Sequence, residues 1–391
     1  MNTALVSVVI PTHNRSSYAV STIRALLVLS QEVEIVVCDT SDTDEISAAF
    51  ATELLSTRVR ILRPNKPLSV VDNFNEALKA ASGQYLIFIG DDDFVSSEIV
   101  NVARWALNNE VEAIKFSFPA QYYWPDFRHH SKGATLGGSI TIEDFDGSIH
   151  PHDGRHAAAE ALQNFGGGVM EMPRAYAGMV SMNLVTRIIQ KHGALFGGVS
   201  PDIYSALLIS MEVRKCVRID YPIIIPGSSG ASTSGQSADR KHVGGLRNNA
   251  HIAPFKNLVW DTCIPEFYSV PTVWSYSLLK AIEKTGMPRG SANFARLYTK
   301  CFLYHTKYTS ITGRTLAAFV HEFGLLHLVF GVLVSLLKES YWVGKKIKAR
   351  VMIKLWGNTL RHSAFHLQNS TEASIYLATY LKSKKAAIKY F

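Results

Sequence analysis

Four aspartates of this chain stand at places where carboxylates could do chemistry. Asp91, Asp92 and Asp93 follow an apolar, strand-like run (YLIFI), and Asp39 follows another such run (EIVVC). Adjacent like charges repel each other unless a cation binds them. Because oxygen ligands suit hard divalent cations, the triplet predicts a metal ion whose coordination a substrate diphosphate would complete. The alternative is a solvated N-terminal cap for a helix that starts near Ser96, for which one aspartate would suffice.

The elements that must position these carboxylates are strands of a mostly parallel sheet. The first third of the chain alternates β-branched runs with helical patterns, which is typical of βαβ units. Apolar residues recur with a period near 3.6 from Val70 onward and predict a helix that ends at Gly83. Ligands bind an open parallel sheet at the carboxyl ends of its strands, so Asp39 and the triplet are expected to face one crevice. The predicted strands cover residues 5–10, 34–38, 59–62, 85–89 and 113–116.

The composition indicates a globular, cytosolic chain with an anionic partner. Of its 391 residues 47% are hydrophobic and 18% are charged, which argues against disorder, a coiled coil or a multispanning membrane protein. The net charge of +8 favours nucleotides, phospholipids or nucleic acid, but no nucleic-acid-binding motif is present, so nucleic acid is not expected as a partner. Four widely spaced cysteines predict reduced thiols, and the N-terminus lacks the basic start of a secretory signal.

The rest of the chain is less regular. Residues 119–168, rich in glycine, histidine and aromatic residues, predict a long insertion or loop. Between 177 and 226 a strand, a helix and the apolar run 221–225 are expected to complete the sheet. A Ser/Gly-rich loop then leads into a region predicted to be mainly helical, which divides the chain into residues 1–226 and residues 227–391.

A segment near the C-terminus has two interpretations. Residues 323–337 carry no Lys, Arg, Asp or Glu and are shorter than the ~20 residues that span a bilayer. In residues 338–361 lysines and arginines alternate with aliphatic and aromatic residues, including Trp342 and Trp356. Such a segment can lie on an anionic membrane surface, with lysines at the phosphates and tryptophans in the interface. It can equally be a helix packed on the core with a solvated basic face.

Four motifs, in this order, resemble those of family 2 glycosyltransferases of the GT-A fold. They are VSVVIPTHNR at 6–15, VEIVVCDTSD at 33–42, DNFNEAL at 72–78 followed by ASGQY at 81–85, and GDDD at 90–93. The resemblance is close over about the first 100 residues and looser up to about residue 225. It implies an α/β GT-A domain over residues 1–226 that binds a nucleoside-diphosphate sugar, and a mainly helical C-terminal region over residues 227–391.

The resemblance also implies roles for single residues. Asp91 and Asp93 match the outer positions of the family's D-x-D motif, whose last aspartate contacts a Mn²⁺ or Mg²⁺ bridging the diphosphate and whose first approaches the ribose. Asp39 matches the acid that contacts the nucleobase, although on position alone it could be an ordinary turn acid. The other positions implied to bind the nucleotide sugar are Pro11, Thr12, His13, Asn73 and Asp92.

Two departures from the family pattern bear on the nucleotide. His13 stands where members often carry a tyrosine, and an imidazole stacks more weakly on a base. The second motif reads Asp-Thr-Ser-Asp rather than Asp-Asn-Gly-Ser, which leaves the preferred nucleotide open.

Inverting transfer also needs a base that deprotonates the acceptor hydroxyl. Family members place this base at the start of a helix well after the metal motif, where GGVSPDIY (197–204) supplies Asp202. The same residues are an ordinary helix start, with Ser200 as cap and Pro201 at the first position.

Other function classes fit the sequence less well. GASTSGQS (230–237) has Gln236 where a P-loop has lysine, so an NTP hydrolase is not expected. This loop, with Arg240 and Lys241 behind it, either contacts the diphosphate or acceptor or is a plain linker. No G-x-G-x-x-G follows the first strand, which excludes a dinucleotide-dependent dehydrogenase. A non-catalytic nucleotide-sugar-binding or scaffolding subunit is the second hypothesis.

The resemblance implies an inverting, metal-dependent glycosyltransferase of bacterial surface polysaccharide biosynthesis. Its acceptor would be a glycan or a lipid-linked sugar. A lipid-linked acceptor would place the enzyme in the cytoplasm, at the inner face of the cytoplasmic membrane, where the basic segment could contact anionic lipids.

Overall fold

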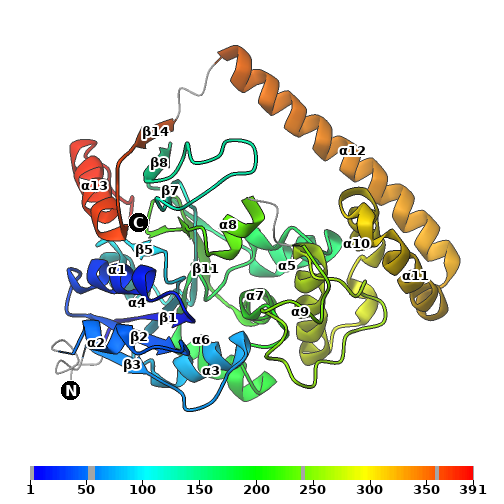
Figure 1. The fold of residues 1–391 in the computed structure, drawn as a ribbon, viewed down its shortest axis with the longest axis horizontal. Coiled ribbons are helices and arrows are strands. Elements are labelled where there is room, and N and C mark those ends of the chain that lie inside the picture. The colour runs from blue at the N-terminus through cyan, green and yellow to red at the C-terminus, as the bar shows by residue number, and fades with distance from the viewer. Residues whose placement is uncertain (1–3, 52–57, 239–242, 357–360, 391) are drawn as a thin grey trace.

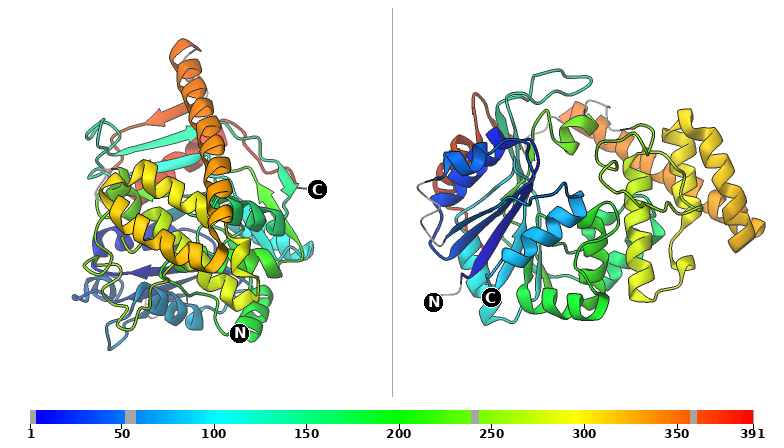
Figure 2. Two further views of the ribbon diagram at one scale, coloured as in Figure 1. Left: turned by 90° about the vertical axis from the view of Figure 1, so that its right-hand side faces the viewer. Right: turned by 60° about the horizontal axis from the view of Figure 1, so that its bottom comes forward.

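An eight-stranded, mostly parallel sheet lies at the centre of the molecule (Figures 1 and 2). The computed structural model describes residues 4–51, 58–238, 243–356 and 361–390. β10 runs antiparallel to β4 and β6, β9 runs antiparallel to β11, and the other neighbours pair in parallel. In spatial order the strands are β3 (Val59–Leu62), β2 (Val33–Asp39), β1 (Val6–Thr12), β4 (Tyr85–Phe88), β10 (Met179–Ser181), β6 (Ala113–Phe116), β11 (Cys216–Ile219) and β9 (Ile149–Pro151).

The early part of the fold confirms the predicted elements. All five predicted strands form as β1, β2, β3, β4 and β6, and helix α3 (Val70–Ala80) forms between β3 and β4. The side chain of Ser69 caps α3 by accepting a hydrogen bond from the backbone N–H of Asp72. The α/β class with a mostly parallel sheet is therefore confirmed.

The sheet separates two hydrophobic cores, because successive side chains of a strand point to opposite faces. On β1, Val8 and Ile10 belong to one core and Val9 to the other. The first core contains residues of α1 (Ser16–Leu27), α2 (Glu45–Ala49), α4 (Ile99–Asn108) and α13 (Ser370–Ser383). The second contains residues of α3, α5 (Gly154–Gln163), α6 (Met182–His192), α7 (Pro201–Glu212), α9 (Val270–Thr285) and α10 (Phe294–Tyr304).

The prediction of a loop over residues 119–168 was wrong. This stretch forms β7 (Ala120–Tyr123), β8 (Ser139–Glu143), β9 and α5. β7 and β8 pair antiparallel and belong to a second sheet with β13 (Gly227–Ser228) and β14 (Arg361–Ala364). The glycines that suggested a loop mark turns instead, since Gly133, Gly138 and Gly147 have positive φ.

The apolar run 221–225 does not complete the main sheet as expected. Its last two residues form β12 (Ile224–Ile225), which pairs with β5 (Phe94–Val95) as a separate two-stranded sheet. The main sheet is extended by β11 instead, which is parallel to β6. β5 follows the Asp triplet directly, so this small sheet holds the segment after residue 225 against the triplet.

The region after residue 227 is mainly helical, as predicted, and contains α8 (Thr233–Ala238), α9, α10, α11 (Thr309–Phe323), α12 (Leu325–Trp356) and α13. Its last part returns to the N-terminal sheet, where β14 pairs with β8 and α13 packs on α1 (Figure 1). Helices from both sides of residue 226, such as α7 and α9, pack on each other in one core. The division of the chain at residue 226 stays a prediction.

Candidate active site

The Asp triplet lies buried in the turn between β4 and β5. Asp91, Asp92 and Asp93 are only 3%, 4% and 5% exposed, so water cannot neutralise their charges and other groups must. Thr22 of α1 holds this turn, since its hydroxyl contacts the backbone carbonyls of Asp91 (2.9 Å) and Asp93 (2.8 Å).

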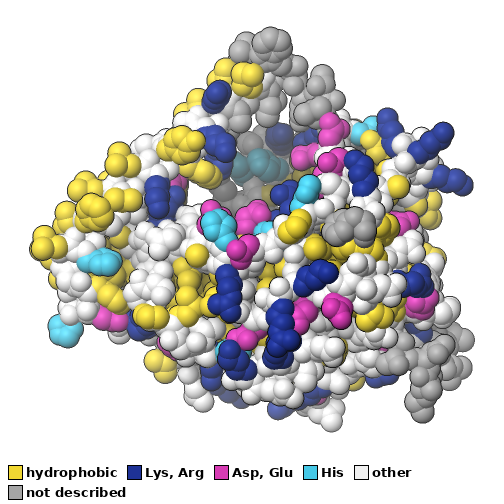
Figure 3. All heavy atoms as spheres, turned by 180° about the vertical axis from the view of Figure 1, so that it is seen from behind, with side chains coloured by type: hydrophobic (Ala, Val, Ile, Leu, Met, Phe, Trp, Pro, Cys, Tyr) yellow, Lys and Arg dark blue, Asp and Glu magenta, His cyan; other side chains and the backbone are white. Residues whose placement is uncertain are grey.

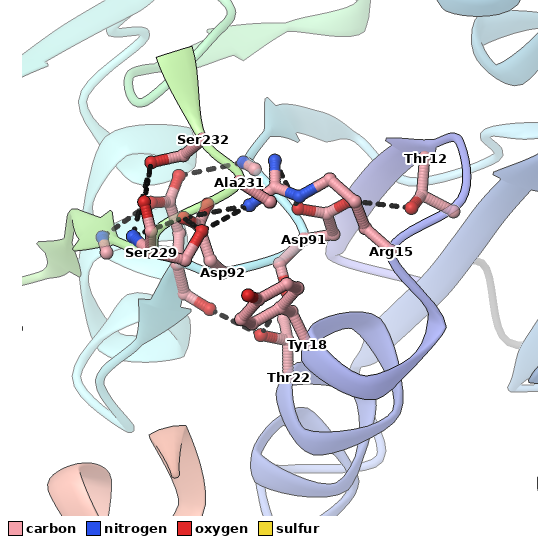
Figure 4. Close-up of polar contacts among 12 residues, drawn as sticks. Thr12, Arg15, Tyr18, Thr22, Asp91, Asp92, Ser229, Ala231 and Ser232 are labelled. Atoms are coloured by element: carbon pink, nitrogen blue, oxygen red, sulfur yellow. Dashed lines mark hydrogen bonds and ion pairs between the residues drawn. The ribbon is translucent and has the colours of Figure 1, made fainter. Parts of the chain in front are cut away.

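Arg15, at the turn between β1 and α1, is the cation that meets the triplet (Figure 4). Its guanidinium forms ion pairs with Asp91 (2.9 Å) and Asp92 (3.0 Å). It also donates a hydrogen bond to the hydroxyl of Ser229 (2.7 Å) and lies 5.1 Å from the centre of the Tyr18 ring. With three aspartates ionised and one arginine, the cluster keeps a formal charge of −2.

Each carboxylate of the triplet also accepts hydrogen bonds. Asp91 accepts one from the Thr12 hydroxyl (2.6 Å), and Asp92 accepts one from the Ser229 hydroxyl (2.7 Å). The two oxygens of Asp93 accept backbone N–H bonds from Gly90 and Gly227, both at 2.7 Å.

These contacts do not fully offset the cost of burying the charges. Burial raises the pKa of Asp91, and the positive charge of Arg15 opposes this effect. Burial raises the pKa of Asp93 as well, Asp92 adds to the rise, and the backbone N–H groups of Gly227 and Gly90 oppose it. A further positive charge would therefore stabilise the ionised carboxylates of this cluster.

The residues expected to bind the nucleotide surround the carboxyl end of β1. Thr12 lies opposite Asp39 in the β1–β2 register, and the side-chain amide of Asn73 on α3 donates to the Thr12 carbonyl (3.4 Å). The amide oxygen of Asn73 is buried, and none of the described residues hydrogen-bonds it. Pro11 precedes Thr12 on β1, whereas His13 is exposed, with a ring nitrogen 2.9 Å from the Thr40 carbonyl.

Asp39 already has a cationic partner. It is 1% exposed, pairs with the guanidinium of Arg63 (2.7 Å) and accepts the backbone N–H of Ser41 (2.8 Å). The structure thus brings Asp39, Thr12, Asn73 and Asp91 to one edge of the sheet, as expected for strands whose carboxyl ends line a crevice.

Asp202 lies half-buried in the first turn of α7 and does not use Ser200 as a conventional cap. Pro201 occupies the first helical position as predicted, but the Ser200 hydroxyl donates to the Asp202 carboxylate (2.9 Å) instead of accepting a backbone N–H. The residue before Ser200 is held by His251, whose ring lies 2.7 Å from the Val199 carbonyl.

Two buried side chains, Tyr176 and Arg174, lie within the electrostatic reach of Asp202, and Tyr176 is also within reach of the triplet. The backbone around them runs beside the end of β4, where Phe88 bonds to Ala175 and Ala177 (2.8 and 2.7 Å). Burial raises the pKa of Tyr176 well above its ordinary value, and the charges of both the triplet and Asp202 act in the same direction. Burial lowers the pKa of Arg174, and the negative charge of Asp202 opposes this effect.

Gly90 leaves the space in which these groups meet. A Cβ at this position would lie 2.8 Å from the Tyr176 hydroxyl and 3.0 Å from a carboxylate oxygen of Asp92. Only glycine allows the triplet and Tyr176 to approach each other this closely.

Several of these residues were missed from the sequence. Arg15 was quoted in a motif without a role, and Arg174, Tyr176 and His251 carried no local signal. The Ser/Gly-rich loop did carry one, since Ser229 at its start contacts Asp92. Arg240 and Lys241, expected behind that loop, lie outside the described residues.

Comparisons with known proteins concern mainly the first part of the chain. Residues 7–159 match the model of Glycosyl transferase family 2. Over this part of its length the chain resembles a family 2 glycosyltransferase domain. The matched residues include β1, α3 and the triplet, so the predicted family and fold are confirmed.

Two curated relatives match parts of this chain. WfaP of Escherichia coli, a "UDP-Glc:alpha-D-GlcNAc-diphosphoundecaprenol beta-1,3-glucosyltransferase", is 29% identical over 125 residues, which are 32% of this chain and 48% of WfaP. The glycosyltransferase GlyG of Streptococcus pneumoniae serotype 4 is 30% identical over 100 residues, which are 25% of this chain and 33% of GlyG. The chain thus spans at most about half of either relative.

Solved structures match more of the chain but weakly. S. aureus TarS 1-349 in complex with UDP-GlcNAc has a TM-score of 0.41 and 12% identity, covering 80% of this chain and 71% of TarS. The mannosyltransferase PcManGT from Pyrobaculum calidifontis, in complex with GDP-Man and Mn2+, has a TM-score of 0.40 and 13% identity, covering 98% of this chain and 88% of that chain.

Proposed function

We propose that this protein is an inverting glycosyltransferase that moves a sugar from a nucleoside-diphosphate sugar to a glycan or lipid-linked acceptor in bacterial surface polysaccharide biosynthesis. The observation that carries the proposal is the buried, under-neutralised Asp triplet at the carboxyl end of β4 in a family 2 domain. WfaP, the relative named as a UDP-glucose-dependent enzyme acting on a diphosphoundecaprenol-linked sugar, supports this donor and acceptor class.

The donor would bind at the edge formed by β1, β2 and α3. Asp39, Pro11, Thr12 and His13 are proposed to line the nucleobase, with Asn73 offering its unpartnered amide oxygen. To meet a ligand, Asp39 would have to exchange or share its contact with Arg63.

The triplet fits a divalent cation by chemistry, although its side chains now face protein groups. Within the described part of the chain, no three His, Cys, Asp or Glu side chains are arranged as a ready metal site. Asp91 and Asp93 nevertheless supply hard oxygen ligands, and each Asp93 oxygen, with one N–H bond, keeps a second lone pair. A bound Mn²⁺ or Mg²⁺ would neutralise the charge that develops on the leaving diphosphate.

Asp202 is proposed to act as the base. Its carboxylate is held by the Ser200 hydroxyl, and with the triplet it influences the same buried Tyr176 hydroxyl. A carboxylate so placed can accept the proton of an acceptor hydroxyl.

The test is release of nucleoside diphosphate from UDP-, GDP- and dTDP-sugars, with EDTA, Mg²⁺ or Mn²⁺. Wild type should release one nucleotide slowly in a metal-dependent way, Asp93→Asn should lose this release, and Asp202→Asn should reduce it while keeping donor binding. Donor binding without release by any variant would favour the non-catalytic subunit. Absence of both binding and release would refute the proposed function.

A further inference from the structure

Helix α12 carries an unusual amount of exposed apolar surface. Of 24 large hydrophobic side chains that are exposed in the described part of the chain, 13 lie on this helix. Several are mostly exposed, including Leu326 (86%), Phe330 (71%) and Leu337 (72%). In Figure 3 apolar side chains line the upper left edge of the molecule, where α12 runs. Contiguous apolar surface of this kind marks an interaction site.

One face of α12 is already used by the protein. Its buried residues, Leu328, Ser335 and Glu339, recur at helical spacing and pack on α10. Arg296 of α10 forms an ion pair with Glu339 and donates to the Ser335 carbonyl (2.9 Å). This buried polar contact fixes the rotation of the helix, so the apolar stripe on the other side must point away from α10.

The exposed stripe runs along most of the helix. Leu326, Val329, Phe330, Leu333 and Leu337 follow the i, i+3, i+4, i+7 spacing of one helix face. After Ser340 and Gly344, Ile347 and Val351 continue the stripe on the same face. At 1.5 Å per residue the segment from Leu325 to Met352 is about 40 Å long. The C-terminal half of α12 projects beyond the body of the protein (Figures 1 and 2).

The exposed charges beside the stripe have one sign. Lys338, Lys345, Lys346 and Lys348 are exposed, whereas the one acid in the helix sequence, Glu339, is 5% exposed and paired. The ammonium group of Lys346 lies 3.6 Å from the centre of the Trp342 ring. At 100° per residue, Lys338 and Lys345 lie at the border of the stripe, whereas Trp342 and Lys346 lie toward the opposite side of the helix. A long apolar face bordered by lysines suits an anionic lipid surface better than an acidic peptide, which offers no hydrocarbon layer for the stripe.

We infer that α12 is an interfacial membrane helix, which lies along an anionic bilayer with its stripe among the acyl chains and its lysines at the lipid phosphates. The segment Leu325–Lys348 is long and apolar enough to cross a membrane, with a mean hydropathy of 1.3. Crossing would, however, carry the Arg296–Glu339 pair and α10 into hydrocarbon, where buried charges are costly. The helix therefore lies on the bilayer rather than through it. This inference concerns where the protein works and does not rest on the identity of its donor.

The inference is tested by co-sedimentation of the full chain with vesicles of phosphatidylcholine containing 30% phosphatidylglycerol. Wild type should bind, and Phe330→Glu/Leu333→Glu should bind at least tenfold more weakly, because both changes put a charge into the stripe. The matched control is Ile375→Glu on α13, whose side chain is 63% exposed but lies off the stripe, and it should bind like wild type. Lys345→Gln/Lys348→Gln should weaken binding to anionic vesicles and reduce its dependence on salt.

Three results would overturn the inference. The first is that wild type fails to sediment with vesicles at low salt. The second is that the control loses as much binding as the stripe variant. The third is that alkaline carbonate fails to release the bound protein, which would indicate a helix that spans the bilayer. Light scattering gives a further check: a concentration-dependent dimer that the stripe variant abolishes would assign the surface to a second copy instead. Nucleotide binding measured without vesicles should be equal in wild type and stripe variant, which separates this test from that of the proposed function.

Discussion

Replacing Arg15 with glutamine should make the stability of the protein depend on a divalent cation. Arg15 pairs with Asp91 and Asp92, whose side chains are 3% and 5% exposed. Removing one partner of a buried pair typically costs about 3–5 kcal/mol, because the other charge stays buried and unpaired. Arg15 itself is 21% exposed, so we expect the lower end of this range, about 3 kcal/mol.

The assay is urea unfolding at pH 7.5, with EDTA or with Mn²⁺. In EDTA, Arg15→Gln should lower the free energy of unfolding by about 3 kcal/mol. A cation that binds only the folded state adds about 2.7 kcal/mol at one hundred times its dissociation constant. Mn²⁺ should therefore recover much of the loss in the variant and should bind it more tightly than wild type, in which the guanidinium competes for the same oxygens.

Arg63→Gln is the matched control. It also removes an arginine from a buried aspartate, Asp39, and should lower stability without making it respond more strongly to Mn²⁺. The reasoning fails if Arg15→Gln is as stable as wild type in EDTA. If Mn²⁺ binds neither protein, the predicted exchange of Arg15 for a metal ion is refuted, and Arg15 is then the permanent counter-charge of a metal-independent site.

Three further predictions concern the rest of the site and the second core. Asp202→Asn should reduce turnover by roughly 10²–10⁴-fold at unchanged donor affinity, as calorimetry and nucleotide release can show, whereas Ser200→Ala should cost far less. Gly90→Ala should lower the free energy of unfolding, measured in urea, by about 1–3 kcal/mol, because its Cβ would lie 2.8 Å from the Tyr176 hydroxyl. An equal loss when the same substitution is made in Tyr176→Phe, which lacks this hydroxyl, would contradict this cause. Burial, aided by the charge of Arg296, lowers the pKa of Lys300 from 10.5 to about 8. Between pH 8 and 10.5 the unfolded chain therefore binds more protons than the folded chain, so the free energy of unfolding should rise with pH over this range by up to about 2–3 kcal/mol relative to Lys300→Met.

The elements that carry the proposed nucleotide site were predictable because their signals are local. β1, β2 and β4 are short, mostly apolar runs buried on both faces, and α3 has both an apolar period and a serine cap. The position of the triplet after β4 followed from these elements alone.

The later elements were less predictable because distant partners decide them. The run 221–225 is as apolar as a central strand, yet it pairs with β5, and β11 with its exposed Arg218 takes the place in the sheet. Residues 119–168 form strands because β13 and β14, more than 80 residues later, pair with β7 and β8. A local sequence pattern does not show which distant strand a segment will pair with.

The least predictable feature of the site is the set of arginines that faces its aspartates. The predicted ligand residues Asp39, Asp91 and Asp92 each pair with an arginine, and Asp202 lies within the electrostatic reach of Arg174. The physical cause is general: a carboxylate buried in readiness for a ligand needs a counter-charge before the ligand arrives. An acidic residue can be recognised from its motif, whereas the fold determines which basic residue lies beside it. Arg15 reaches the triplet from the turn after β1, the strand next to β4, and Arg63 reaches Asp39 from the end of β3. Binding at this site should therefore be an exchange of partners, in which a ligand or metal ion gains only the difference between its own contacts and those of the arginine that it displaces.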